Sequence, residues 1–183
     1  MANRLTKIFT RTGDEGYTSL GDVRLSKDDL LIEALGNIDE LNSAIGFIIA
    51  MRPQNEAVEN YLTQIQQDLF DFGAEMHIPE RVMITPEKVL WLETTLQTFN
   101  KTLPPLKEFL LPRGNPASSA AHLARTTCRR AERSLVRLHR QVTLANLEML
   151  RYINRLSDLM FVTARILAKV SREEELMWEK DRT

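Results

Sequence analysis

The stretch MLRYINRLSDLMFVTARILAKV, residues 149–170, decides the fold. Apolar and small residues recur in it at alternating steps of four and three, which places them along one side of a helix. The residues of this seam are Met149, Ile153, Leu156, Met160, Thr163, Leu167 and Val170. A heptad spacing of this kind is typical of helices that pack side by side in a bundle.

Helical periodicity continues outward from this seam in four earlier segments. Thr85 and Pro86 open one of them, because a hydroxyl residue caps a helix and proline fits its first position. We expect helices at about 28–51, 56–76, 86–99, 117–140 and 143–170. The inner face of the fourth is built of Ala121, Ala124, Cys128, Ala131, Leu135 and Leu138. The sequence therefore predicts an all-α five-helix bundle.

The composition fits one domain over residues 1–183, with an N-terminal loop (1–27), the bundle (28–170) and a charged tail (171–183) that we expect to be frayed. A net charge of -1 argues against nucleic-acid binding and against binding to a membrane through a polybasic surface. The single cysteine excludes an internal disulfide and a multi-cysteine zinc site. No signal peptide or membrane span is recognisable, so we expect a cytoplasmic protein.

The positive charge is unevenly distributed. The chain has 17 Arg against 7 Lys, and ten of the arginines lie between residues 113 and 165. Four of them form a row at steps of four: Arg125, Arg129, Arg133 and Arg137. Like charges at this spacing repel one another, so the row suggests an anionic partner. That partner is either a phosphate ligand or a set of acids from another helix or subunit.

The segment TRTGDEGYTSLG, residues 10–21, combines glycines, hydroxyls and a cation. Backbone N–H groups in glycine-rich turns can cradle a polyphosphate, although the order of a Walker A loop is absent. The alternative is a solvated N-terminal tail.

Two further polar residues interrupt apolar helices. Asn154 lies beside the seam and serves either as a register device or as a ligand contact. Asp39 follows Ile38 in an apolar helix, so we expect it to be partly buried and to need a cationic partner.

The sequence predicts no metal ligands among the protein side chains. His77, His122 and His139 lack the spacing of metal ligands, and we take them as structural or exposed. Cys128 lies among small inner residues and is expected to serve packing. No activated Ser or Cys stands out, so the nucleophile of any reaction would arrive with the substrate.

Five sequence blocks, in order along the chain, carry a family resemblance. They are TRTGDEGYTSL, SKDD, GNIDELN, CRRAER and YINRLSDLMFVTAR, and they span residues 8–165. Together they resemble the propanediol-utilisation type of ATP:cob(I)alamin adenosyltransferases. The resemblance implies a homotrimer of five-helix bundles with active sites between subunits. It also implies transfer of the 5′-deoxyadenosyl group of ATP to Co(I) of a corrinoid, with release of triphosphate.

The resemblance also implies roles for individual residues. Thr10, Arg11, Thr12 and Gly13 match the family's phosphate loop, and Thr18 and Lys27 also line ATP. Arg129, Arg130, Glu132, Arg133 and Asn154 match nucleotide contacts, with Arg133 placed on the polyphosphate.

For the corrinoid side, Asp39 and Arg129 match a salt bridge between subunits, and Phe109 matches the aromatic residue that displaces the lower ligand of cobalamin. Mg²⁺ is implied by the triphosphate. The chain departs from the family at Arg113, where we expect a small residue, so the corrinoid preference stays open. Arg11 stands where lysine is common, which keeps the charge.

Two alternatives to turnover remain: an ATP-binding regulator, or an escort that delivers adenosylcobalamin. A corrinoid reductase and an adenosylcobalamin-dependent enzyme are the partners that the resemblance implies.

Overall fold

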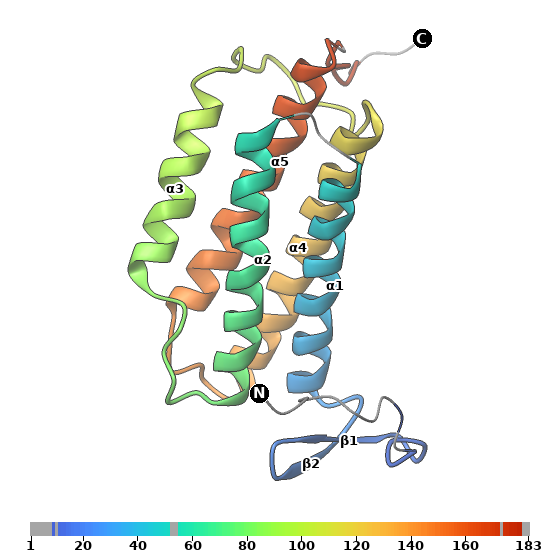
Figure 1. Ribbon diagram of the computed structural model, residues 1–183, viewed down its shortest axis with the longest axis vertical. Coiled ribbons are helices and arrows are strands. Elements are labelled where there is room, and N and C mark those ends of the chain that lie inside the picture. The colour runs from blue at the N-terminus through green and yellow to red at the C-terminus, as the bar shows by residue number, and fades with distance from the viewer. Residues whose placement is uncertain (1–8, 10, 52–54, 173, 181–183) are drawn as a thin grey trace.

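A computed structural model describes residues 9, 11–51, 55–172 and 174–180. Within them the chain forms a helical bundle and one small hairpin (Figure 1). The helices are α1 (Leu30–Ala50), α2 (Glu56–His77), α3 (Pro86–Asn100), α4 (Pro116–Gln141) and α5 (Glu148–Val170). The strands are β1 (Tyr17–Leu20) and β2 (Val23–Ser26), paired antiparallel. The all-α five-helix prediction is confirmed.

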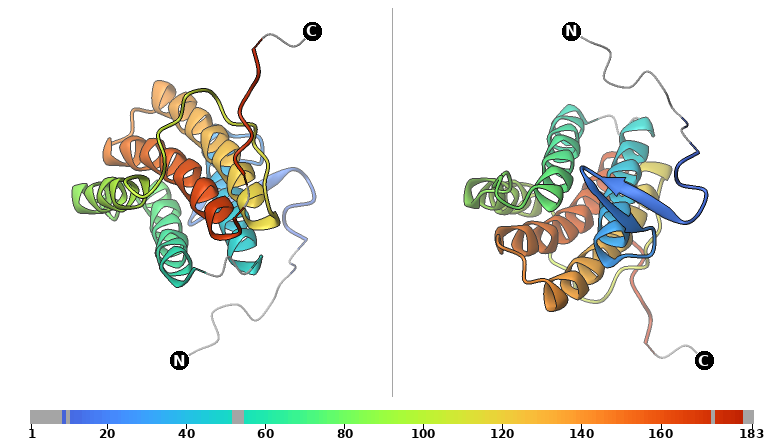
Figure 2. Two further views of the ribbon diagram at one scale, coloured as in Figure 1. Left: turned by 90° about the horizontal axis from the view of Figure 1, so that it is seen from above. Right: turned by 90° about the horizontal axis from the view of Figure 1, so that it is seen from below.

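Helix α4 lies between α1 and α5 and packs along both, while α3 packs on α5 and α2 on α1 (Figure 2). The six small and apolar residues of its inner face are all buried, so the neighbouring helices can approach closely. The α5 seam is buried from Met149 to Leu167, but Val170 is 40% exposed, which corrects its assignment to the seam. None of the described helices has the length and apolarity needed to cross a membrane.

Polar caps set where the helices begin. Asp29 caps α1, because its carboxylate accepts a hydrogen bond from the Leu31 N–H at 2.8 Å, so the helix starts at Leu30 and not at residue 28. Asn115 caps α4 in the same way through the Ser118 N–H. Pro86 is the first residue of α3 as predicted, although the Thr85 side chain makes no capping bond to the backbone.

The last helix begins at Glu148 and not near residue 143. Asn146 explains the difference, because its side-chain amide donates to Glu75 Oε1 at 2.7 Å and to the Ile84 carbonyl at 2.8 Å. Its oxygen accepts from the Glu148 N–H and so starts the helix. These tertiary contacts hold residues 143–147 as a connection that local periodicity does not reveal.

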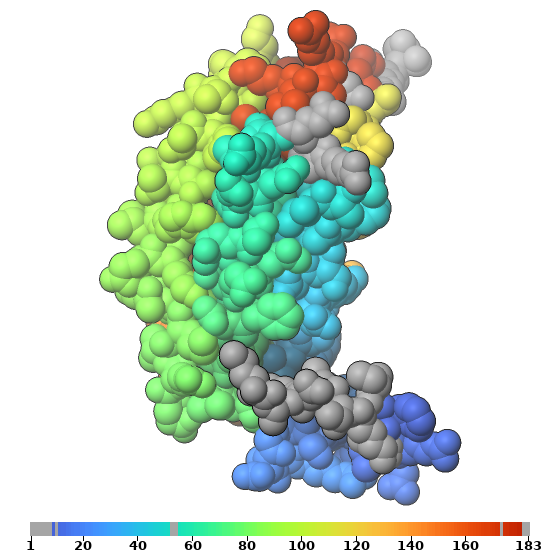
Figure 3. Space-filling view, viewed as in Figure 1, coloured from blue at the N-terminus to red at the C-terminus, as the bar shows by residue number. Residues whose placement is uncertain are grey.

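The N-terminal segment, predicted as a loop, contains the β1–β2 hairpin below the bundle (Figure 3). Its turn needs Gly21, which has a φ of +58°. A Cβ at Gly21 would come within 2.8 Å of the His77 ring, so the hairpin turn packs closely on the end of α2.

The C-terminal tail is more ordered than the sequence predicts. Residues 174–180 were expected to be frayed, yet Met177 pairs with Leu110 in an antiparallel bridge.

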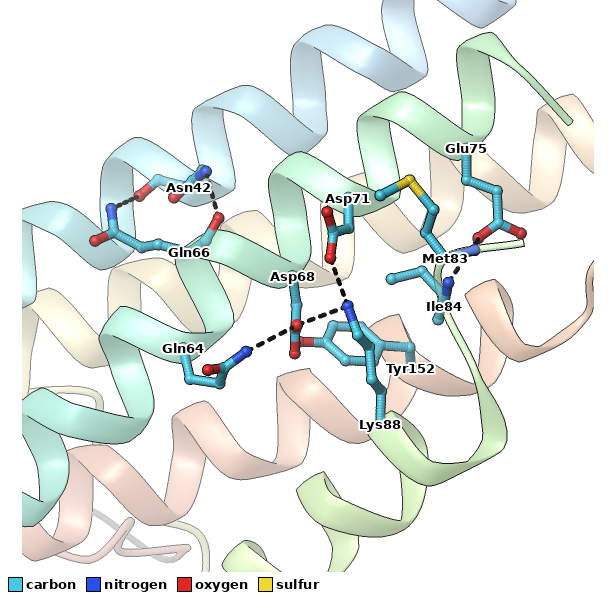
Figure 4. Close-up of polar contacts among 10 residues, drawn as sticks. All are labelled: Asn42, Gln64, Gln66, Asp68, Asp71, Glu75, Met83, Ile84, Lys88 and Tyr152. Carbon is cyan, nitrogen blue, oxygen red and sulfur yellow. Dashed lines mark hydrogen bonds and ion pairs between the residues drawn. The ribbon is translucent and has the colours of Figure 1, made fainter. Parts of the chain in front are cut away.

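A buried polar cluster joins α2, α3 and α5 (Figure 4). Asp68 is 1% exposed and forms an ion pair with Lys88 Nζ at 2.9 Å. It also accepts hydrogen bonds from the Tyr152 hydroxyl at 3.0 Å and from Gln64 at 3.1 Å. Lys88 contacts Asp71 as well, at 2.7 Å. Burial alone would lower the pKa of Lys88, but the two carboxylates raise it, so the lysine stays charged.

Replacing Lys88 with methionine is expected to lower the free energy of unfolding by about 3 kcal/mol, because the buried carboxyl group of Asp68 loses its cationic partner. Urea unfolding at pH 7 measures the change. Lys101→Met, at an exposed lysine just after α3, serves as the control and should stay within about 0.5 kcal/mol of the starting protein. Equal stabilities of the two variants would contradict this role of the cluster.

Candidate active site

The cationic face of α4 is the largest concentration of charge in the fold. Arg129, Arg130, Arg133 and Arg137 are exposed on it, while Arg125 is half-buried. The face exists because the opposite side of α4 is made of small residues that the bundle buries. Arg125 and Arg137 lie about 18 Å apart along the axis, at about 1.5 Å per residue. The row therefore lines much of the length of the helix.

Two of these arginines are neutralised within the chain. Arg137 forms an ion pair with Glu33 on α1 at 3.2 Å. Arg130 pairs with Glu40 and donates to Asn37, both also on α1. The role of Arg130 as a nucleotide contact therefore competes with a structural role and stays a prediction.

Arg129 and Arg133 differ from them. Across the residues that the structure describes, neither has an acid within ion-pair distance. Arg133 lines an open hollow of about 610 Å³ together with Glu132, Val136, Arg137, Arg140 and Gln141. Two exposed guanidinium groups that form no ion pair of their own are suited to bind an anion with several oxygens.

Asn154 connects this face to α5. Its amide donates to Glu132 Oε1 at 2.9 Å, and its oxygen accepts from Arg155 at 2.7 Å. Arg155 in turn binds Glu93 on α3 at 2.8 Å. Asn154 and Glu132, predicted from separate motifs, are thus brought together at the edge of the arginine row.

The N-terminal segment forms a tight turn ahead of the hairpin. Arg11 has a left-handed φ of 61°, which is uncommon for a residue with a Cβ. Gly13 leaves room for Lys27, whose Nζ would lie 3.1 Å from a Cβ at that position. The Gly16 N–H donates to the Gly13 carbonyl at 3.2 Å, which closes the turn, and the Lys27 N–H donates to the Gly16 carbonyl at 2.8 Å at the open end of the hairpin.

Among the remaining predicted residues of this segment, Thr12 is exposed and Thr18 is half-buried on β1. Thr10 lies outside the described residues. The turn therefore has the glycines, backbone groups and cations of a phosphate loop in one place.

The hairpin that follows the turn lies at the end of the bundle where α4 ends and α1 begins (Figure 1). Within the described part of one chain, however, no ion pair links the turn to the arginine face. The ion pairs of α4 run to Glu33 and Glu40 on α1, whereas Arg24 of the hairpin pairs with Glu15 at 3.9 Å. One chain thus contains both the turn and the arginine row, and their ion pairs are separate.

Phe109 lies at the opposite end of the bundle, in the loop between α3 and α4. Its ring is 77% exposed. It lines a cavity of about 500 Å³ with Leu106, Lys107, Glu108, Leu110, His122, Arg125 and Phe161. A neighbouring cavity of about 310 Å³ is lined by Leu96, Asn100, Arg125, Arg129, Ser157, Asp158, Phe161 and Val162. Arg125 and Phe161 belong to both cavities, so they form the wall between them.

The electrostatics of this end follow from burial. The pKa of His122 is lowered to about 4, mainly by burial and further by the charge of Arg125, so its ring is neutral at pH 7. Burial, with a smaller effect of Arg129, lowers the pKa of Arg125, which still remains cationic. The Nε of Arg125 is buried and has no hydrogen-bond partner among the described residues. A buried donor of this kind is costly to leave unpaired.

Asp39 was expected to be partly buried, but the structure places it on the exposed face of α1. Both Asp39 and its neighbour Glu40 face solvent, because Ile38 and Leu41 occupy the buried positions of α1. Within the described part of one chain, no ion pair joins Asp39 to Arg129. The predicted salt bridge between subunits therefore stays a prediction.

Sequence reasoning missed Arg125, His122 and Phe161 as cavity residues. His122 was assigned a structural or exposed position; its 6% exposure agrees with the structural alternative, but the sequence did not show that it lines the cavity beside Phe109. The available signals were weak: Arg125 heads the arginine row, and Phe161 follows Asn154 by seven residues on α5.

Comparisons with known proteins agree along the whole chain. The family model for cobalamin adenosyltransferase matches residues 8–167. A cobalamin adenosyltransferase from Cupriavidus metallidurans is 45% identical over 183 residues, which cover 100% of this chain and 99% of the relative. The corrinoid adenosyltransferase of Bacillus subtilis is 41% identical over 180 residues, covering 95% of this chain and 93% of the relative.

Solved structures give the same result. A variant of the PduO-type ATP:corrinoid adenosyltransferase from Lactobacillus reuteri, complexed with ATP, superposes with a TM-score of 0.87 at 33% identity and covers 94% of this chain and all of that chain. Another variant of that enzyme, complexed with cobalamin and ATP, gives 0.86 at 34% identity and covers 96% and 98%. Given this agreement of sequence and fold, the chain belongs to the cobalamin adenosyltransferase family.

Proposed function

We propose that the chain transfers the 5′-deoxyadenosyl group of ATP to the Co(I) centre of a corrinoid and releases triphosphate. The observation that carries the proposal is the pair Arg129 and Arg133, two exposed guanidinium groups that form no ion pair within the described part of the chain. They lie between a phosphate-loop-like turn at one end of the bundle and the cavity of Phe109 at the other.

The chemistry explains why no activated side chain is needed. The electron pair of Co(I) attacks the ribose C5′ carbon, a Co–C bond forms, and the C5′–O bond breaks. The triphosphate leaves with the bonding electrons, and the cobalt becomes formally Co(III). The protein has to align the two reactants and to stabilise the charge that develops on the leaving group.

We assign the binding of the leaving group to Arg133 and Arg129, with the turn around Arg11, Thr12 and Gly13 supplying backbone N–H groups. Thr10, Thr18 and Lys27 belong to the same proposed loop, and Asn154 and Glu132 to the nucleoside side. Arg130 is assigned a secondary role because Glu40 already binds it.

Mg²⁺ belongs to this proposal as a companion of the triphosphate. No cluster of three or more acidic, His or Cys residues suited to hold a metal occurs among the described residues. Mg²⁺ keeps much of its water and prefers phosphate oxygens with one or two carboxylates. Glu132 is the carboxylate in the arginine hollow, so the fit is that of a metal that arrives with ATP and screens its charge.

For the corrinoid, the cavities beside Phe109 offer aromatic and aliphatic walls with a neutral His122. We assign Phe109 the displacement of the lower cobalt ligand, which leaves a four-coordinate Co(II) that is easier to reduce. An external reductase must supply the electron. An adenosylcobalamin-dependent enzyme would consume the product, and we place the whole sequence of steps in the cytoplasm.

We further propose that the working form is a homotrimer with sites between subunits. In support, one chain contains both the proposed phosphate-loop turn and the arginine row, but no ion pair connects the two within the described residues. A neighbouring copy that brings its turn to this row would complete the site.

Arg133→Ala is expected to reduce kcat/KM for ATP by roughly 10²–10³-fold, since a cationic donor to the leaving group is lost. The formation of adenosylcobalamin from ATP, Mg²⁺ and chemically reduced cobalamin is followed by absorbance. Arg151→Ala, at an exposed arginine paired with Glu148, should keep full activity. Normal turnover of Arg133→Ala would remove it from the phosphate site, and absence of turnover in the unmodified protein would leave the regulator or escort as the function.

Asp39→Ala is expected to raise KM for the corrinoid and to weaken the trimer, because a cation of the neighbouring subunit loses its partner, while KM for ATP stays unchanged. Glu40→Ala is the matched control, since Glu40 pairs with Arg130 inside its own chain. Kinetics and light scattering of both variants give the answer. If the two variants behave alike, Asp39 has no special place in the corrinoid site.

A further inference from the structure

The C-terminal tail is paired with the loop that carries Phe109. Leu110 and Met177 form an antiparallel bridge. On either side of it the Leu111 N–H donates to the Leu176 carbonyl at 2.9 Å, and the Trp178 N–H donates to the Phe109 carbonyl at 2.7 Å. The backbone of Phe109 is therefore held directly by the tail.

The ring of Phe109 is 77% exposed, so few side-chain contacts fix it. Its own N–H is bound only locally, by the carboxylate of Glu108 at 2.9 Å. The position of the ring at the cavity mouth therefore depends on the backbone of residues 109–111, and that backbone depends on its pairing with the tail.

One buried guanidinium on α5 anchors both segments. Arg165 is 4% exposed. Its Nε and Nη2 donate to the two carboxylate oxygens of Glu175 at 2.7 and 3.0 Å. The same Nη2 donates to the carbonyl of Pro104 at 2.9 Å, at the start of the Phe109 loop. The tail and the loop are thus tied to a single rigid point of the bundle.

The bridge between the tail and the loop is too short to persist alone. Short two-stranded pairings are marginal in water, and chain ends fray unless something ties them down. A forked contact between a guanidinium and a carboxylate is strong and directional, above all where water is excluded. The space left between the tail, α4 and α5 is only about 10 Å³, at the lower limit for one water.

We propose that Arg165 and Glu175 are positioning residues: their ion pair holds the tail as a strap across residues 109–111 and so sets the place of Phe109 at the corrinoid cavity. This role rests on the proposed function, since Phe109 matters only if the cavity receives the corrinoid. Neither residue touches the substrates. Arg165 acts from within the bundle, and Glu175 acts through the strap.

Trp178 provides a reporter within the strap. The chain has two tryptophans, and replacing Trp91 of α3 with phenylalanine leaves Trp178 as the single fluorophore. In that background Glu175→Gln removes the negative charge from the Arg165–Glu175 ion pair, which we call the latch, and keeps the size of the side chain. Glu174→Gln, at the exposed neighbouring acid, is the matched control. Arg165→Lys is a second variant that keeps the charge but loses the forked contact.

We expect Glu175→Gln to raise the acrylamide quenching constant of Trp178 severalfold and to lower kcat with reduced cobalamin by roughly ten- to a hundredfold, as for a misplaced active-site group. KM for ATP should not change. Arg165→Lys should fall between Glu175→Gln and the control, and Glu174→Gln should match the background protein in quenching and in kinetics.

Unchanged quenching and kinetics in Glu175→Gln would overturn the proposal. So would an equal loss of ATP use and corrinoid use together with a lowered melting temperature, because that pattern marks a purely structural ion pair. Failure of the proposed function would appear differently: the background protein itself would form no adenosylcobalamin, while the quenching would still report whether the latch holds the strap.

Discussion

The rest of the structure depends on charge that one chain does not neutralise. Arg129 and Arg133 are exposed on α4 and form no ion pair among the described residues, while their neighbours Arg130 and Arg137 are paired with α1. A row of like charges is unfavourable in isolation and becomes favourable when an anion with several oxygens lies against it. The small residues on the inner face of α4 make this possible, because they let the bundle close while Arg129, Arg130, Arg133 and Arg137 stay exposed.

The bundle separates two tasks along this helix. Toward one end, the arginine hollow and the glycine-containing turn are suited to phosphates. Toward the other, Phe109, His122 and Phe161 line cavities suited to a large ring system, and Arg125 lies in the wall between these cavities. Such an arrangement sets a nucleotide and a corrinoid side by side, with positioning and electrostatics as the contributions of the protein.

The sequence allowed the helices to be predicted because their signals are local. Periodicity located the helices, and caps such as Asn115 agree with it to within a few residues. The predicted start of α5 was wrong, because Asn146 is held by hydrogen bonds to Glu75 and Ile84, which are distant in sequence. The order of the tail was missed for the same reason, since its partners lie on the Phe109 loop and on Arg165.

For the candidate site, separate motifs pointed to Asn154 and Glu132, and the fold brings these two residues into contact, while their role toward the nucleotide stays a prediction. Motifs could not show that Arg130 is engaged by Glu40 or that Asp39 faces outward, because a side chain's partner depends on the packing of α1 against α4. The same holds for His122, whose burial follows from tertiary structure alone.

The central claim is that the turn of one subunit meets the arginine row of its neighbour, and complementation between two inactive chains tests it most directly. Arg11→Ala would disable the turn, and Arg133→Ala would disable the row. If the site is shared, mixed trimers of the two variants regain activity, up to about a quarter of the unmodified level for random mixing, because one interface in four pairs an intact turn with an intact row. If the mixed trimers assemble and stay inactive, each site belongs to a single chain and the account is wrong.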